Sequence, residues 1–278
     1  HLVSKTARKA VNQLHMAVEN NSTLLDFSPA LKNFFVEIGD LSYFAARFFK
    51  EGFTPPYEWR EFLRQCYYIG NRSLALVAVT AFIIGLVFTL QSRPTLEEFG
   101  AVSWMSSMVS ISIVREIGPI ITALICAGRV SSGISAELGS MRVSEQIDAM
   151  EVSGTNPFKY LVVTRIFAAT LMLPLLVLVG DLIAIYGSFL VENTMGNVSL
   201  TLYFNDVFEA LKFSDLFPAT IKTFFFGFAI GLVGCYKGYT CRKGTAGVGI
   251  AANAAVVYTS MLLFLIDFIA VIISNIVY

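Results

Sequence analysis

Five long apolar runs constrain the fold of this chain more than any other feature of its sequence. They cover residues 73–91, 101–128, 166–191, 216–236 and 254–277. Each has about the 20 mainly apolar residues that an α-helix needs to cross the hydrocarbon core of a bilayer. The composition agrees, with 55% hydrophobic and 14% charged residues and a mean hydropathy of +0.67. The sequence therefore predicts an all-α membrane protein with about five transmembrane helices.

Several classes of function are excluded or disfavoured. The formal net charge is zero, so the chain has no basic excess of the kind that binds nucleic acid. No GxxxxGK[ST], HExxH or GxSxG motif occurs, so the chain lacks the usual loop for nucleotide hydrolysis. The four cysteines form no CxxC pair, and we expect neither a disulfide framework nor a metal site.

An amphipathic segment precedes the first apolar run. In residues 29–50 the apolar side chains recur at helical spacing, and most of the charged ones fall elsewhere on the helix. The segment has too many charges to span, so we expect it to lie in the headgroup plane with its apolar face down. We accordingly divide the chain into an N-terminal interfacial region, residues 1–60, and a transmembrane region, residues 61–278.

The distribution of Lys and Arg predicts the orientation. Basic residues are concentrated before the first run, between the second and third, and between the fourth and fifth, whereas the other two connections are mainly acidic. The basic residues are Arg60, Arg64, Arg72, Arg129, Arg142, Lys159, Arg165, Lys237, Arg242 and Lys243. Because short cytoplasmic loops carry the Lys and Arg excess, we expect a cytoplasmic N-terminus and a periplasmic C-terminus.

A charged strip, ELGSMRVSEQIDAMEVSGTNP, lies between the second and third runs at residues 137–157. Val143, Ile147 and Met150 share one helical face, and Gly154 with the following Asn-Pro ends the helix. Two interpretations are open. The strip is either a connector resting on the membrane surface or a docking helix for a cytosolic partner. Its acidic residues weigh against the first, since the cytoplasmic leaflet is itself negative.

Four of the five runs contain ionisable residues, namely Arg115, Glu116, Asp181, Lys222 and Asp267. Each costs about 2.5 to 3.5 kcal/mol at mid-membrane if it faces lipid. They either pair with one another as contacts between helices or face a polar cavity. Adjacent residues on a helix point about 100° apart and cannot both face one partner. For Arg115-Glu116 and Lys222 we therefore favour a shared cavity, and Pro119 nearby predicts a kink or break.

Two stretches carry a resemblance to a known family. VREIGPIITALICAGRVSSGISAELGSMRVSEQIDAMEVSGTNPFKYLVVTRIFA, starting at Val114, resembles the core of the MlaE (YrbE-like) permeases, and TAGVGIAANAAVV, starting at Thr245, resembles their C-terminal pattern. The similarity runs from about residue 60 to the end, whereas residues 1–28 have no counterpart. It implies an ABC transporter permease that moves phospholipid or a related lipid between the inner membrane and the outer envelope.

The resemblance also implies partners. In that family two copies of the permease form a homodimer, a cytosolic ABC ATPase dimer binds below, and a periplasmic ring of MCE-domain protein lies above. Some systems add a STAS-domain protein. ATP and Mg²⁺ are held by the ATPase, so no cofactor is expected in this chain. The implied location is the inner membrane of a Gram-negative-type bacterium.

Site residues follow from the matching motifs. The resemblance places Arg115, Glu116, Lys222 and Asp267 along the lipid path, with Asp181 less evenly represented. It makes the charged strip a coupling helix between the second and third spans. The residues expected to contact the ATPase are Glu145, Gln146, Ile147, Asp148, Met150 and Glu151.

Two other functions remain open on the residues alone. An ion-driven secondary transporter would use Glu116, Asp181 and Asp267 as a relay, although five spans do not divide into inverted repeats. A passive scaffold would explain a docking helix but not the charges in the spans. Dependence of transport on a partner ATPase separates the first proposal from both.

Overall fold

The computed structural model describes residues 29–55, 57–241 and 244–277, and this part of the chain consists of helices and short connections, with no strand. It divides into two units, His1–Arg47 and Phe48–Tyr278. Within the described ranges, five helical segments are long and apolar enough to cross a membrane. The predicted all-α membrane fold with five spans is therefore confirmed.

Helix α2 (Pro29–Gly52) provides the described part of the first unit and the start of the second. It matches the amphipathic helix that the sequence predicts at residues 29–50. Phe35 is 60% exposed and Tyr43 is 76% exposed. The placement of this helix in the headgroup plane stays a prediction. The stretch without a family counterpart, residues 1–28, lies outside the described residues.

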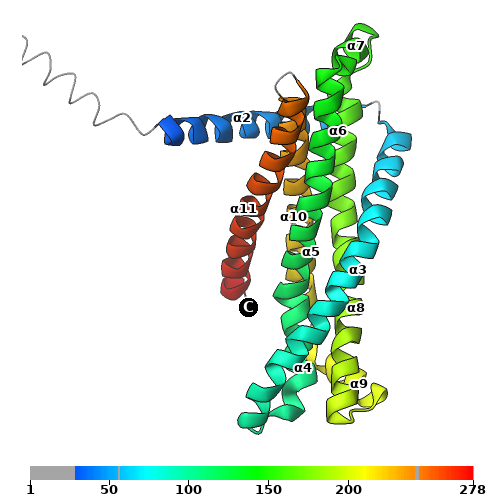
Figure 1. The fold of residues 1–278 in the computed structure, drawn as a ribbon, viewed down its shortest axis with the longest axis vertical. Helices are drawn as coiled ribbons and strands as arrows, with labels where there is room; N and C mark the ends of the chain where they lie inside the picture. The colour runs from blue at the N-terminus through cyan, green and yellow to red at the C-terminus, as the bar shows by residue number, and fades with distance from the viewer. Residues whose placement is uncertain (1–28, 56, 242–243, 278) are drawn as a thin grey trace, which may run out of the picture. The chain divides into compact units, whose positions relative to one another are not determined.

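The spans of the second unit run lengthwise beside one another (Figure 1). They are α3 (Trp59–Glu98), the composite helix Val102–Val143, the composite helix Phe158–Gly196, α10 (Phe213–Tyr239) and α11 (Thr245–Val277). Helix α7 (Gln146–Val152) lies at one end of these spans, and α9 (Leu200–Ala210) lies at the other (Figure 1). Each helix extends beyond its apolar run, because helical structure continues through the polar residues of the interface.

The two composite helices change from α to π geometry along their length. The second span consists of η1 (Val102–Trp104), α4 (Met105–Ser112), η2 (Ile113–Ile117), α5 (Gly118–Cys126), η3 (Ala127–Ser131) and α6 (Ser132–Val143). The third consists of η4 (Phe158–Val163) and α8 (Thr164–Gly196). Segments η2, η3 and η4 are π-helical.

Of the kink or break predicted near Pro119, the break does not occur, and a π-helical turn lies directly before the proline. Pro119 lies in the first turn of α5, directly after the π-helical turn η2. Proline lacks an N–H and its ring clashes with the carbonyl four residues earlier. The wider π turn before Pro119 does not need the missing N–H and leaves room for the ring. The helix therefore continues through this point.

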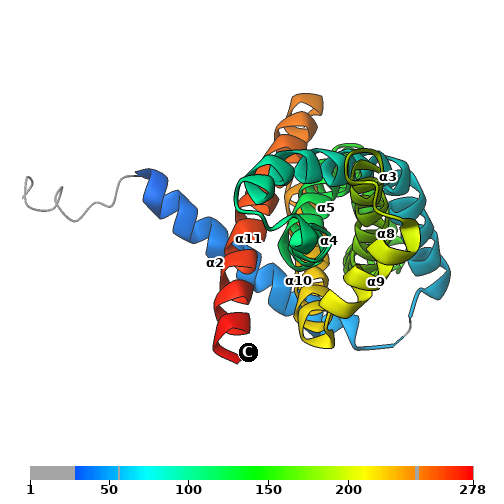
Figure 2. The ribbon, with the colours of Figure 1, turned by 90° about the horizontal axis from the view of Figure 1, so that it is seen from below.

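Glycines allow α10 to approach two neighbours closely. A Cβ on Gly227 would lie 2.5 Å from the carbonyl oxygen of Ala169 in α8. On the other side, a Cβ on Gly238 would lie 2.7 Å from the carbonyl oxygen of Ser135 in α6. Only a residue without a Cβ permits these contacts, as is common between membrane helices. Figure 2 shows α10 near the centre of the bundle, with α11 beside it.

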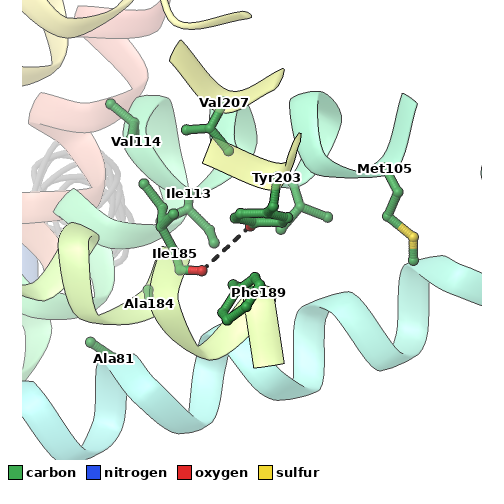
Figure 3. Packing of buried hydrophobic residues seen from close by; sticks show 10 residues of the cluster. Ala81, Met105, Ile113, Val114, Ala184, Ile185, Phe189, Tyr203 and Val207 are labelled. Carbon is green, nitrogen blue, oxygen red and sulfur yellow. Dashed lines mark hydrogen bonds between the residues drawn. The ribbon is translucent and has the colours of Figure 1, made fainter. Parts of the chain in front are cut away.

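A buried cluster holds α9 against the spans at the end opposite α7. Tyr203 of α9 packs among Phe189 and Ile185 of α8 and Ile113 of the second span (Figure 3). Its hydroxyl donates to the carbonyl oxygen of Ile185 at 3.4 Å. Burial raises the pKa of Tyr203 to about 12, although a hydrogen bond with Ser188 acts in the opposite direction. The phenol is therefore neutral in the folded protein.

Candidate functional site

A lysine inside the bundle connects three spans. Lys222 of α10 places Nζ 2.7 Å from Oε2 of Glu116 in η2 and 3.0 Å from Oδ1 of Asp267 in α11. The contact with Glu116 is also a hydrogen bond, whereas the contact with Asp267 is an ion pair without hydrogen-bond alignment. The Lys222 side chain is 5% exposed, that of Asp267 19% and that of Glu116 47%. Only the glutamate therefore presents much of its carboxylate outward.

A second ion pair lies beside the first. Nε of Arg115 is 3.3 Å from Oδ1 of Asp215, in the first turn of α10. The other carboxylate oxygen of Asp215 accepts the backbone N–H of Lys212 and so caps α10. Arg115 and Glu116 thus contact different residues, about two turns apart on the same helix. We call Arg115, Glu116, Asp215, Lys222 and Asp267 the charge cluster.

The charge cluster borders a polar cavity of about 140 Å³. Arg115, Glu116, Asp215 and Lys222 line it together with Ser274 and Asn275. We expected a shared cavity in place of a direct pair between Glu116 and Lys222. The expectation was wrong about the pair, because Lys222 and Glu116 are in direct contact. A polar cavity does lie beside them. Arg115, with 48% of its side chain exposed, and Glu116 remain accessible to a ligand.

Asp181 does not join the charge cluster. It lies on α8, is 6% exposed, and forms no ion pair among the described residues. Its carboxylate packs against Gly118 so closely that a Cβ on this glycine would overlap it. The side-chain oxygen Oδ1 has no hydrogen-bond partner in the described part of the chain. Asp181 therefore lies beside the charge cluster, next to Gly118, which is two residues along the chain from Glu116, without forming an ion pair with the cluster in the described part of the chain.

Sequence reasoning missed several buried charges, and Arg165 and Asp215 are two of them. Arg165, with 2% of its side chain exposed, pairs with Glu137 at 2.9 Å, although we counted it among the loop charges. Asp215 likewise belongs to the acidic connection before the fourth apolar run in the sequence. Both lie next to the ends of apolar runs, inside helices that extend beyond those runs. Their position directly beside an apolar run was the signal in the sequence that could have indicated burial inside a helix.

The expected ATPase contact forms a separate helix. Glu145 precedes α7 with φ of 59°, in the left-handed region, so the chain turns sharply between α6 and α7. Ile147 is 1% exposed and holds the helix against the bundle, whereas Val152 is 91% exposed. Asp148 forms an ion pair with Arg142. Of the remaining expected contact residues, Gln146 and Glu151 are exposed and Met150 is half-buried.

A larger cavity shares no lining residue with the charge cluster. It measures about 540 Å³, and Phe62, Phe167, Leu171 and Phe224 are among the residues on its almost wholly apolar wall. Such a wall offers no charge pattern for recognition, so we do not place the functional site there. No group of His, Cys, Asp or Glu in the described residues is arranged to hold a metal ion.

Comparisons with known proteins agree with this architecture. A model of the family described as Permease MlaE matches residues 62–273. A probable ABC transporter permease protein of Rickettsia typhi is 40% identical over 215 residues, covering 77% of this chain and 83% of the relative. A probable ABC transporter permease protein of Synechocystis is 35% identical over 209 residues, covering 75% and 80%.

A plant relative is also similar. The chloroplastic protein TRIGALACTOSYLDIACYLGLYCEROL 1 of Arabidopsis thaliana is 33% identical over 211 residues, covering 76% of this chain and 60% of the relative. The family match extends over all five spans, including the charge cluster and α7. The chain therefore belongs to the MlaE permease family of ABC transporter permeases.

Proposed function

We propose that this permease moves phospholipid or a related lipid between the inner membrane and the outer envelope, driven by a separate ATPase. The observation that supports it most is the charge cluster beside a polar cavity inside the spans. Charges are costly at membrane depth and are retained there where they serve a path. The name of the Arabidopsis relative, which is that of a galactolipid, also favours a lipid.

The two accessible charges suit a lipid headgroup. Arg115 offers a planar guanidinium to phosphate, and Glu116 offers a carboxylate to an amine. Each is about half exposed at the cavity, while Lys222 is occupied by its two carboxylates. Lys222 therefore positions Glu116, and the apolar helix surfaces around the cavity accommodate the acyl tails. Recognition would depend on the charge pattern of the headgroup and little on tail chemistry.

Helix α7 is the proposed site of ATPase binding. It is short, it is exposed except for Ile147 and part of Met150, and it lies at the end that the basic connections assign to the cytoplasm. A second copy of the chain is the proposed partner for α11, of whose most apolar stretch only 11% is buried. An MCE-domain protein at the periplasmic end, and a STAS-domain protein in some systems, complete the proposed assembly.

Lipids that remain with the purified permease test this function. Mass spectrometry of the detergent-extracted complex should find phospholipid with the wild type and much less with Arg115→Ala. Arg60→Ala, which removes an exposed arginine from the start of α3, serves as the matched control. Equal lipid retention by all three proteins would show that the cavity beside the charge cluster is not the lipid site.

A further inference from the structure

A second polar cavity lies between α3 and the later part of the second span. It measures about 190 Å³ and shares no lining residue with the cavity of the charge cluster. The polar side chains on its wall are Gln65, Tyr68, Arg72, Ser73, Arg129 and Glu137. Arg129 belongs to η3, the second π-helical turn of that span, whereas Arg115 belongs to the first. The two arginines are about 20 Å apart along the helix axis.

Two positive charges on this wall have no counter-ion among the described residues. Arg72 stacks on the ring of Tyr68 at 4.0 Å and donates to its hydroxyl. Neither Arg72 nor Arg129 forms an ion pair with a carboxylate in the described part of the chain. Glu137, the carboxylate on the wall, is engaged by the buried Arg165 at 2.9 Å. The cavity therefore favours an anion.

A buried hydroxyl gives an independent indication of a ligand. Ser73 lines the cavity and is 1% exposed, yet its Oγ has no hydrogen-bond partner among the described residues. Leaving a buried polar group without a partner is unfavourable, so such a group points to a ligand. An anion oxygen in the cavity would accept this hydroxyl proton. Gln65 is held in place on the same wall, since its amide donates to Glu61 at 2.7 Å.

The position of the cavity along the spans matches one kind of anion. Arg72 directly precedes the uncharged run 73–91, and Arg129 directly follows the apolar run 101–128. By their positions at the ends of these runs, both arginines are expected where the hydrocarbon core meets the headgroups. The phosphates of membrane lipids are concentrated at that level, and arginine binds phosphate through paired hydrogen bonds.

We propose that this cavity binds the phosphate group of a lipid headgroup from the leaflet at the α7 end. Arg72 and Arg129 hold the phosphate from two helices, and Ser73 donates to one of its oxygens. The site is separate from the charge cluster. It goes beyond the proposed transport function, because the same groups would bind lipid phosphate in a chain that exported nothing.

Native mass spectrometry of the full-length permease can test the site with a short-chain phosphatidylglycerol as the probe. Arg72→Gln with Arg129→Gln should weaken binding at one site by at least about tenfold, because both charged donors to the phosphate are removed. Ser73→Ala should weaken the same site less. Arg60→Gln is the control with an exposed arginine on the same helix. Unchanged melting temperatures establish that the variants are folded.

Inorganic phosphate distinguishes the two sources of the anion. It should compete with the lipid only at much higher concentration, because it lacks the tails that the bilayer side of the site accommodates. Binding of inorganic phosphate as tight as that of the lipid would overturn the assignment to a headgroup. Equal lipid binding by the wild type and the double variant would overturn the site itself. Neither result depends on ATP-driven transfer, so failure here is distinct from failure of the proposed function.

Discussion

Replacing Lys222 by methionine is the most informative single change in the charge cluster. Methionine keeps most of the side-chain volume and removes Nζ, which leaves Glu116 and Asp267 without their cation. Removing one partner of a buried pair costs about 3–5 kcal/mol. Glu116 is 47% exposed, so water compensates part of its loss. We therefore expect a destabilisation near the lower limit, about 3 kcal/mol.

A double substitution separates the cost of the unpaired Asp267 carboxylate from the other effects of Lys222→Met on stability. In Lys222→Met with Asp267→Asn no unpaired carboxylate remains at the less exposed position, so we expect about 2 kcal/mol to be recovered. Glu116→Gln alone should cost only about 1 kcal/mol, because its carboxylate is half exposed and Lys222 keeps Asp267. Thermal unfolding in one detergent, followed by circular dichroism, measures all three. A Lys222→Met protein that melts with the wild type, as the exposed Lys50→Met control should, would refute this reasoning.

Three further predictions concern packing, titration and docking. Gly227→Leu should prevent folding or lower the melting temperature strongly, because its side chain would overlap the backbone of α8, whereas Gly128→Ala, with open space around it, should be tolerated. The raised pKa of Tyr203 predicts stability that is complete below pH 10, the ordinary tyrosine value, and is lost as the pH rises toward about 12. The free energy of unfolding of the Tyr203→Phe protein should lack this loss when it is measured beside that of the wild type between pH 10 and about 12. Charge reversal at Glu145 and Asp148 should release the ATPase in a pull-down while the permease stays folded in the membrane, since both side chains are exposed; continued copurification and coupling at the wild-type level would contradict the docking role of α7.

Local patterns predicted the helices well. Apolar run length indicated five spans, and helical periodicity indicated α2 and α7, because each signal depends on residues close together in the sequence. The limits of the spans were less predictable. Charged residues such as Asp215 and Arg165 ended the apolar runs in the sequence, yet in the structure they lie inside the helices and pair with Arg115 and Glu137.

The partners of the charges could not be predicted from spacing. Glu116 and Lys222 are in different spans, so their contact depends on how the helices are rotated and how deeply α10 packs through its glycines. The π-helical turn that carries Arg115 and Glu116 has no sequence pattern of its own, although Pro119 indicated an irregularity. Asp181 was grouped with the others because it lies in a span, and the structure buries it next to Gly118 without a hydrogen-bond partner for Oδ1 among the described residues.

ATP-driven lipid transfer measures the central claim most directly. The permease and its ATPase would be reconstituted in vesicles with fluorescent phospholipid, ionophores that abolish proton and sodium gradients, and acceptor vesicles containing the MCE-domain protein. We expect transfer that requires ATP and the ATPase, survives the ionophores, and falls in Glu116→Gln without loss of ATPase binding. Transfer that proceeds without the ATPase and stops when the ion gradient collapses would contradict the account and indicate a secondary transporter.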